Sequence, residues 1–487
     1  MSADRTDASP LPPNVRLGLV LFVCCAGQFL VVLDASVVNV ALPSIKEALR
    51  FDTESLQWVI NAYTIPFAGF LLLGGRLADL FGRRTAFLGG LAVFTVASLI
   101  GGLSTNSATL LTARAVQGLG AAVLAPATLT VIFTSFTDSK KRAKAFGMWS
   151  AVAAAGGAVG VLLGGAITEW VSWRWILLIN VPVGVVLIVC VLRVITEARN
   201  EKAQSRMDAP GAVAITLGVV ALAYGLVLSL DEGWGSGKVL GVLAAAVVLL
   251  GLFVLNEAKL AANPLVPLSV FRNRSVSAGN IVALTSSAAL WGTFYLFTLL
   301  LQLGLGYSPL RTGLAYLPLA IGMFVAARGI AGHIDRFGAR SILLTGLTLS
   351  AVGLVWLSFA DAEANFAADL FGPTLLLGVG QGLVSASMTV AATTGVPWQQ
   401  AGLVSGLLNT SRQVGGALGL AALAVVAASY SGADATSPAA LVDGYGAAFL
   451  VSATFPAAGL LAALAVPRPP REKTAASVPA KSEPSKG

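Results

Sequence analysis

The sequence predicts an all-α protein that crosses a membrane many times. Of its 487 residues, 56% are hydrophobic and only 11% are charged, and the mean hydropathy is +0.82. Soluble domains carry about a quarter charged residues. The apolar residues fall in repeated blocks close to the ~20 residues that cross a bilayer as a helix. Only helices and closed barrels satisfy their backbone in lipid, and the short alternating segments of a barrel are absent from the sequence.

Charge and cysteine usage exclude several other classes of protein. The formal charge of +8 is expected to come from basic loops on the cytoplasmic side, and no nucleic-acid partner is expected. Cys24, Cys25 and Cys190 lie inside apolar blocks, so we expect neither a disulfide nor a metal site. The N-terminus carries acids and prolines and lacks a cleavage site, so the first apolar block should be retained as a span.

The apolar blocks predict fourteen spans. Most of the 31 lysines and arginines then fall on the side of both termini, which predicts cytoplasmic termini in a bacterial plasma membrane. A missed or extra span would scramble this bias. The predicted spans are 17–41, 57–75, 85–104, 107–133, 143–168, 174–194, 210–230, 238–256, 275–303, 311–332, 340–360, 366–392, 402–430 and 445–466.

Internal repeats divide the chain into two six-span bundles. The charged loops Gly75–Arg84 and Ala331–Arg340 follow one pattern, and two more pairs of motifs recur in the same order. Each pair is offset by eight spans, and an even offset preserves direction, so the halves are parallel repeats. Spans 7 and 8 are then an inserted pair. The predicted organisation is a cytoplasmic N-tail at 1–16, an N-terminal bundle at 17–194, linkers with the inserted helices at 195–274, a C-terminal bundle at 275–466 and a disordered C-tail at 467–487.

Four motifs, in order on successive spans, give the chain a family resemblance. It resembles the major facilitator superfamily and, within it, the fourteen-span drug/proton antiporters of the EmrB/QacA type. The motifs are Leu33-Asp34-Ala-Ser-Val-Val-Asn39-Val-Ala-Leu42-Pro43 in span 1, Gly75-x-Leu77-x-Asp79-x-x-Gly82-Arg83-Arg84 in the first charged loop, Arg114-x-x-Gln117-Gly118-x-Gly120 in span 4, and Trp173-Arg174-Trp175 with Asn180-Val-Pro182 at the start of span 6.

The resemblance implies a fold and a function. The fold would be two six-helix bundles with two extra central helices. The function would be proton-coupled efflux of hydrophobic small molecules, drugs or antibiotics by alternating access. The partners would be a small hydrophobic or aromatic substrate and the lipid bilayer, with a monomer as the working unit. No cofactor is implied, and the proton would be the coupling ion.

One motif in span 5 departs from the family pattern. The antiporter signature has proline after its second glycine, whereas this chain has Val161. The proline kink is therefore not expected. The glycines remain and are expected to let helix backbones approach closely; they are Gly156, Gly160, Gly164 and Gly165.

Asp34 and Arg114 are the candidate proton-coupling pair. A carboxylate inside a span costs about 2.5–3.5 kcal/mol on insertion scales, so it should be paired, protonated or facing water. Counting residues from the predicted span ends puts both side chains roughly 10 Å below the outer surface. Arginine favours the carboxylate form of Asp34 and burial favours the neutral acid, so such a site can load and release a proton. The alternatives are a helix-end aspartate in the headgroup region for Asp34 and a static structural pair for Arg114.

The two charged loops are candidate gates. The resemblance implies that Asp79, helped by Arg83 or Arg84, holds the cytoplasmic side closed against the N-terminal end of span 13, where the helix dipole favours an anion. Gly75 and Gly82 permit the tight turn. Asp335, Gly338 and Arg340 are the expected counterparts in the second half. The alternative, compatible with a gate, is that the arginines fix topology.

Polar and aromatic residues inside spans are candidates for the substrate cavity. Arg412 lies near mid-membrane in span 13, and the second half offers no intramembrane acid to pair with it. It is expected to face water, which predicts a substrate that is not a dication and is neutral or anionic; the alternative is that it bonds helix carbonyls. The other candidates, each of which packing alone would also explain, are Asn39, Trp58, Asn61, Trp291, Tyr295 and Asn409.

Other functions fit the sequence less well. A proton-coupled metabolite transporter of the same superfamily, importer or specific exporter, is the alternative reading. An enzyme is not expected, because the chain has one histidine and no cluster of ligands or nucleophiles. A phosphate-binding loop for an ATP-driven pump is absent from the sequence. A passive channel does not account for a parallel repeat with paired gates.

Overall fold

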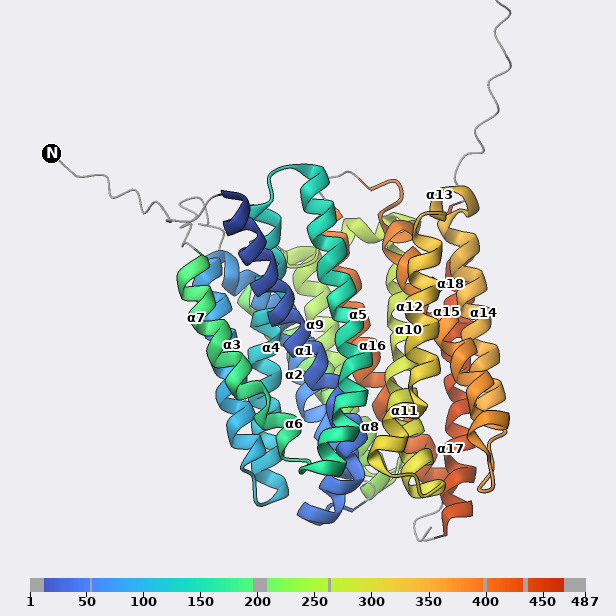
Figure 1. Cartoon of the computed structure of the whole chain (residues 1–487). Helices are drawn as coiled ribbons and strands as arrows, with labels where there is room; N and C mark the ends of the chain where they lie inside the picture. The colour runs from blue at the N-terminus through green and yellow to red at the C-terminus, as the bar shows by residue number, and fades with distance from the viewer. Residues whose placement is uncertain are drawn as a thin grey trace, which may run out of the picture.

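Long helices running up and down make up the computed structural model, with both ends of the described chain on the same side (Figure 1). The structure describes residues 13–52, 55–195, 208–261, 264–396, 401–431 and 437–467. We call the side where α1 begins and α18 ends the terminal side. The helices of the first bundle are α1 Pro13–Leu49, α2 Trp58–Phe81, α3 Arg83–Gly102, α4 Ser107–Ser135, α5 Ser139–Trp170, α6 Trp175–Leu178 and α7 Asn180–Val194, with a 3₁₀ turn at Ser55–Gln57.

A second bundle and an inserted pair complete the helices. The inserted pair is α8 Ala209–Glu232 and α9 Gly237–Leu255, which ends in the π-turn Asn256–Leu260. The second bundle contains α10 Arg274–Leu299, α11 Pro309–Ala315, α12 Leu317–Ala331, α13 Ile334–Phe337, α14 Ala339–Leu357, α15 Phe371–Thr393, α16 Ala401–Ser431, α17 Pro438–Ser452 and α18 Thr454–Ala463, with short turns at Leu268–Arg272, Leu300–Gly304 and Phe366–Leu370.

Local sequence signals explain where several helices begin. Asn106 accepts a hydrogen bond from the Thr109 N–H at 2.9 Å and caps α4, and Asp138 accepts from the Lys141 N–H at 2.8 Å and caps α5. These side chains satisfy N–H groups that lack a partner in the first turn. Asp208 does the same for α8.

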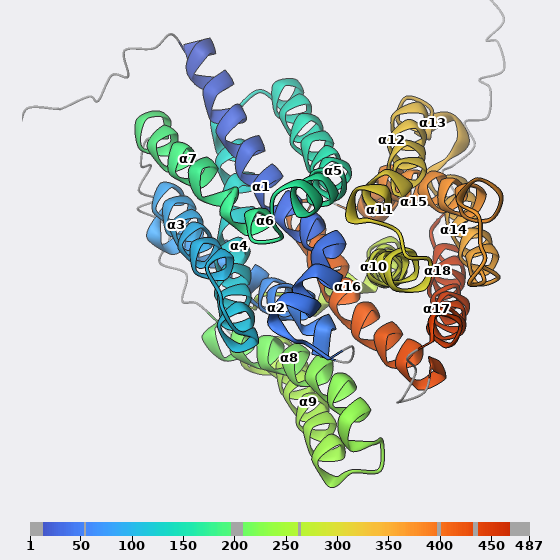
Figure 2. The same ribbon diagram turned by 60° about the horizontal axis from the view of Figure 1, so that its bottom comes forward.

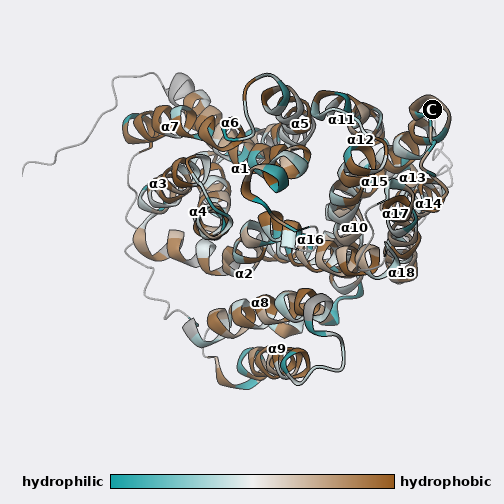
Figure 3. Ribbon diagram, turned by 90° about the horizontal axis from the view of Figure 1, so that it is seen from below, coloured by the Kyte–Doolittle hydropathy of each residue, from teal (hydrophilic) through white to brown (hydrophobic). Residues whose placement is uncertain are grey.

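Twelve helical segments of the described chain are long and apolar enough to cross a membrane. Large hydrophobic side chains are exposed along the outward surfaces of the helices, including α8 and α9 (Figure 3). Two more long helices, α2 with 24 residues and α5 with 32, stand among them in the bundle but are not among the twelve. The chain is therefore a multi-pass membrane protein, and the count of fourteen spans stays a prediction.

Two predicted span ends differ from the helices. The first span was expected to end near Ala41, but α1 continues to Leu49, and Leu42, Ile45 and Leu49 of this extension are buried. The last predicted span, 445–466, begins earlier and is broken at Ala453, between α17 and α18. Proline at a first helical position is favourable, and Pro438 occupies that place in α17.

The two bundles share one continuous core on the side opposite the termini. Buried residues of α1, such as Ile45, lie in the same hydrophobic cluster as Leu301 and Phe449 of the second bundle. Two hydrogen bonds cross the interface there. The Gln302 side chain donates to the Val40 carbonyl at 2.8 Å, and the Leu310 N–H donates to the Glu169 carboxylate at 2.8 Å.

The terminal side has no such shared core among the described residues. The buried residues there form two clusters, one in the first bundle and one in the second. The helices α2 and α16 stay in contact nearer the middle, where Ile65 and Ala417 are buried together, and Leu73 of α2 packs against the second cluster. The bundles are thus closed together opposite the termini and joined mainly along α2 and α16 elsewhere.

The inserted pair lies outside the two bundles, against α2 and α16 (Figure 2). The Thr216 hydroxyl of α8 donates to the Gly69 carbonyl of α2 at 2.6 Å. Ala223 of α8 is buried between Ile65 and Ala417. At the terminal side, the Asn256 amide donates to the Asp208 carboxylate at 2.7 Å and ties the end of α9 to the start of α8.

Candidate functional site

A buried ion pair lies inside the first bundle. The Arg114 guanidinium of α4 donates to the Asp34 carboxylate of α1 at 2.5 Å, and the two side chains are 1% and 0% exposed. Fifteen further residues of α1 follow Asp34, and its carboxylate is sealed from solvent, so a buried pair is favoured over the alternative of an aspartate in the headgroup region.

Three N–H donors converge on the Asp34 carboxylate. Besides Arg114, the amides of Gln117 and Asn180 donate to Oδ1 at 2.8 Å and 2.7 Å. Gln117 also accepts from Arg114 at 2.8 Å and donates to the Ser98 hydroxyl at 2.7 Å. Three donors suit an ionised carboxylate, which only accepts hydrogen bonds.

The rest of the Arg114 side chain is satisfied by α2. Its Nε donates to the Val59 carbonyl at 3.2 Å, and its guanidinium carbon lies 4.4 Å from the centre of the Tyr63 ring. A cation over an aromatic face is favourable, more so when both are buried. Residues of α1, α2, α3, α4 and α7 therefore meet at one polar centre, which we call the acid–arginine centre and define as Asp34, Ser98, Arg114, Gln117 and Asn180.

This centre can respond to a proton. Protonating Asp34 would remove the negative charge that balances Arg114 and turn one carboxylate oxygen from acceptor into donor. Breaking a buried pair by removing one charge is costly, about 3–5 kcal/mol. A proton arriving at Asp34 therefore changes the interactions of five helices at once. In the present conformation the carboxylate is shielded, so exchange with water requires another arrangement of the helices.

Sequence reasoning missed three members of the centre as functional residues, namely Ser98, Gln117 and Asn180. Two signals could have found them. Gln117 follows Arg114 by three residues, so both lie on one face of α4. Asn180 is a polar residue at the start of α7, which is apolar from there to Arg193 in its last turn.

The predicted gating loops show the same geometry in both bundles. Gly82 and Gly338 have φ values of 91° and 78°, a region that favours glycine. Directly after the first, Arg84 donates to the Leu192 carbonyl of α7 at 2.8 Å; after the second, Arg340 donates to the Val466 carbonyl beyond α18 at 3.2 Å. Each arginine thus holds the terminal-side end of the last helix of its own bundle.

The hydrogen bond made by Arg84 differs from one expectation for the first charged loop. Arg84 was expected to help close the terminal side against α16, but here it bonds within its own bundle. The side chains of Asp79 and Asp335 lie outside what the structure describes. Gly75 lies in α2, where an added Cβ would be 3.8 Å from Pro126, an ordinary contact. Closure by Asp79 and Arg83 stays a prediction.

The span-5 glycines line the packing surface of α5. An added Cβ would come within 3.2 Å of Phe29 at Gly156, 2.9 Å of Ser36 at Gly160 and 2.6 Å of the Val37 carbonyl at Gly164, all on α1. At Gly165 the neighbour is the Pro309 carbonyl of α11, at 2.6 Å. α5 is one continuous helix past Val161, as expected without the proline.

The predicted cavity residues separate into two groups. The Trp58 ring contacts the Tyr224 ring of α8 in a tilted arrangement, with ring centres 5.8 Å apart. Tyr295 is buried in the core opposite the termini. These two pack against neighbouring helices. Asn39 and Asn61 are buried. Among the described residues, the side-chain amide oxygen of Asn39 and both polar atoms of the Asn61 side-chain amide lack a hydrogen-bond partner. Water or substrate is needed to satisfy them.

The remaining candidates lie on α16, which stands between α2 and α10 (Figure 2). Arg412 is exposed and Asn409 half-buried. One turn further along this face, an added Cβ on Gly416 would be 2.8 Å from the Trp291 ring. Trp291 is half-buried and also packs against the core of the first bundle. Arg412 therefore lies on the face of α16 that is aimed between the bundles.

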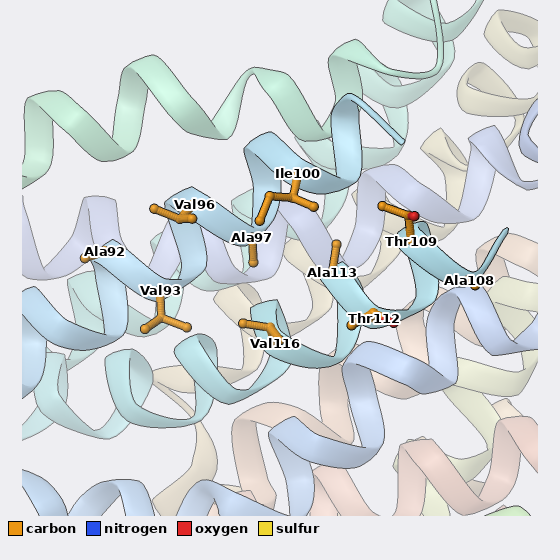
Figure 4. Close-up of a pocket in the computed structure, with 10 residues that line it drawn as sticks. All are labelled: Ala92, Val93, Val96, Ala97, Ile100, Ala108, Thr109, Thr112, Ala113 and Val116. Carbon is orange, nitrogen blue, oxygen red and sulfur yellow. The ribbon is translucent and has the colours of Figure 1, made fainter. Parts of the chain in front are cut away.

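A separate hollow lies on the outside of the first bundle, between α3 and α4 (Figure 4). Its volume is about 600 Å³, and small or branched apolar side chains line it, with two threonine hydroxyls. Val96 and Ile100 at its wall are largely exposed. This surface faces the lipid and does not include the acid–arginine centre, although Ala97 and Ala113 of the hollow adjoin Ser98 and Arg114 in sequence.

Comparisons with known proteins agree with this architecture. The family model described as Major Facilitator Superfamily matches residues 24–420 and, again, 330–485. The cephamycin export protein of Amycolatopsis lactamdurans is 42% identical over 455 residues, which cover 93% of each chain. The puromycin resistance protein of Streptomyces alboniger is 39% identical over 480 residues, which cover 95% of this chain and 94% of that one.

Solved structures share the arrangement of helices at low sequence identity. A bacterial homologue of the human lysosomal transporter Spinster has a TM-score of 0.65 and 16% identity, covering 93% of this chain and 98% of that one. A POT family transporter has a TM-score of 0.67 and 17% identity, covering 93% of this chain and 99% of that one. At such identity the likeness shows the fold alone.

Proposed function

Since this chain belongs to the Major Facilitator Superfamily, we propose that it exports hydrophobic small molecules, including antibiotics, in exchange for protons. Like its relatives, the chain is a transporter and not an enzyme. Export rather than import is supported by relatives named for antibiotic export and resistance that match over nearly their whole length. A further relative, 35% identical, is named for tetracenomycin C resistance and export.

The observation that carries proton coupling is the buried acid–arginine centre. A transporter that only bound a neutral cargo would have no need of an ionisable pair in a region where each charge costs several kcal/mol. The proposal gives Asp34 the proton and Arg114 the task of holding the carboxylate when the proton has left. Alternating access would expose Asp34 to each side in turn.

The proposal also implies which conformation the structure represents and which branch of the family the chain belongs to. With both termini in the cytoplasm of a bacterium, the terminal side is the cytoplasmic side. The structure, in which the two bundles are closed together opposite the termini, is then the inward-facing state. Counting α2 and α5 with the twelve apolar helices gives the fourteen spans of the EmrB/QacA branch, with α8 and α9 as the extra pair.

A susceptibility panel in an efflux-deficient bacterial host tests the proposal. The panel includes puromycin, a cephamycin and tetracenomycin C, and each drug is tested with and without a protonophore. Expression of the chain should raise resistance to at least one compound, and both the protonophore and the Asp34→Asn variant should abolish the gain. Resistance that survives the protonophore would overturn proton coupling. Unchanged susceptibility, combined with proton-dependent uptake of a metabolite, would instead favour the metabolite transporter.

A further inference from the structure

Arg412 is a cation without an anion in the middle of the molecule. Within the part of the chain that the structure describes, it forms no ion pair or hydrogen bond, and the two ion pairs found join other residues. It lies nine residues beyond Leu403, where the apolar span begins, so at 1.5 Å per residue it is roughly 13 Å deep. Its alternative role, bonding helix carbonyls, is not what the structure shows.

The helix that carries Arg412 aims it between the bundles. Residues of α16 that recur every three or four positions share a face. Leu408, Ser411 and Gly415 face α10, where Ser411 donates to Asn280 at 2.8 Å. Ala417 faces α2 and α8. Between these two covered faces lies a third stripe, which we call the interbundle face and define as Ser405, Asn409, Arg412 and Gly416.

The interbundle face has a cation at its centre and an aromatic ring at its end. Ser405 and Arg412 are exposed, Asn409 is half-buried, and Gly416 lies against the Trp291 indole. An added Cβ at Gly416 would lie 2.8 Å from the Trp291 ring, so the glycine lets the indole approach the helix here. On the terminal side the bundles form separate cores, and the Arg412 side chain is exposed on this face.

We propose that this face is a subsite for hydrophobic organic anions, with the substrate carboxylate on the Arg412 guanidinium and its apolar body against Trp291. The inference rests on the proposed function, since it names the substrate class of the same transporter. An unpaired arginine at this depth is unfavourable, and a carboxylate brought by the substrate offsets that cost. The guanidinium fork matches a carboxylate with two parallel hydrogen bonds, which an ammonium group does not reproduce.

A matched pair of ligands tests the charge requirement. The probes are 1-pyrenebutyrate and its methyl ester, which share one apolar body and differ in the anion. Binding to the purified full-length protein in lipid nanodiscs is followed by energy transfer from tryptophan to pyrene. A charge-assisted hydrogen bond contributes about 1.5–3 kcal/mol, so the acid should bind about 10- to 100-fold more tightly than the ester.

Variants then locate the preference. Arg412→Gln should weaken binding of the acid to the level of the ester and leave ester binding within about twofold, and Arg412→Lys should retain part of the preference. Arg311→Gln is the matched control, because Arg311 is exposed over Tyr307 on the opposite side. A preference that survives Arg412→Gln, or an acid that binds no better than the ester, would overturn the subsite.

The same variant separates the subsite from export itself. If Arg412→Gln loses resistance only to carboxylate drugs and keeps it for neutral ones, subsite and exporter both stand. If wild-type protein exports neutral drugs but shows no preference for the acid, the subsite falls and export stands. If the acid preference is present and depends on Arg412 but no drug is exported, the subsite stands and the proposed function falls.

Discussion

The two bundles place the same motif in different chemical surroundings. In the first bundle Gln117 donates to the Asp34 carboxylate and accepts from Arg114; in the second, Gln381 accepts from the Ser286 hydroxyl at 2.8 Å. Three residues before Gln381, where Arg114 would have its counterpart, the chain has Gly378. A backbone repeat thus carries a charged pair on one side and a neutral contact on the other.

The two bundles also differ in the surroundings of their membrane-embedded arginines. The first holds its arginine against an acid, fully buried and with every helix around it engaged. The second holds Arg412 without an acid, exposed between the bundles. Under the proposed function, the first bundle would bind the proton and the second would select the cargo.

The largest expected effect comes from removing the acid of the first bundle. Asp34→Asn leaves Arg114 buried without its anion, a change that costs about 3–5 kcal/mol, and we expect proton-driven efflux to fall to background. Efflux is measured by drug accumulation in cells, with the amount of protein in the membrane checked in parallel. The double variant with Arg114→Gln removes both charges and should recover stability but not transport. Proton-dependent efflux by the single variant would remove Asp34 from the mechanism.

The repeated glutamines should differ when each is replaced by leucine. Gln117→Leu takes a donor from the buried carboxylate and should cost about 1–3 kcal/mol, with efflux reduced roughly tenfold. Gln381→Leu breaks only a contact with a hydroxyl and should leave efflux within about twofold. Both variants are compared by thermal unfolding in detergent and by drug accumulation. Equal losses would mean that the two motifs serve the same purpose.

The loop glycines should not differ between the bundles. Gly82→Ala and Gly338→Ala force a side chain into an extended backbone region with positive φ that is sparsely populated by residues other than glycine, at about 1–3 kcal/mol each. We expect similar decreases in unfolding temperature for the two variants. Gly89→Ala is the control, because that position is helical and an added Cβ meets nothing within 4 Å. A decrease confined to one loop would show that the repeat does not extend to these turns.

The smallest effects are expected at the loop arginines. Arg84→Ala and Arg340→Ala each release one hydrogen bond to the end of a helix, worth about 1 kcal/mol. Hydrogen exchange of the last turn of α7 in the first variant, and of α18 in the second, should accelerate while the rest of the bundle is unchanged. Exchange that stays slow in both variants would show that these bonds do not hold the helix ends.

Much of this architecture could be predicted because lipid simplifies the problem. A span must be helical and about 20 residues long, so hydropathy alone locates α3, α4 and α10 within a few residues. Asp34 and Arg114 stand out because charges are rare in spans, and their depths follow from counting residues. The break at Ala453 between α17 and α18 leaves no mark in the hydropathy; its sequence signal is Pro456, which has no N–H to continue the helical hydrogen bonds from α17.

The neutral part of the site could not be predicted for the opposite reason. Ser98 is an ordinary polar residue among others in α3, and only the packing of α3 against α4 brings it to Gln117 of the centre. Trp58 and Tyr295 were expected in the cavity because aromatic residues serve both packing and binding. Which of the two applies depends on helix rotation, and the sequence of one helix does not contain the position of its neighbour.

The placement of α8 has a consequence for the interface between the bundles. This helix covers the seam between α2 and α16 from the lipid side, with Thr216 bonded to Gly69 and Ala223 buried in the seam. Across the molecule, α5 meets α11 through Gly165 and Glu169, near its end opposite the termini. The two flanks of the interface between the bundles are therefore closed differently, because a third element, α8, lies over α2 and α16 on one flank, whereas α5 contacts α11 directly on the other.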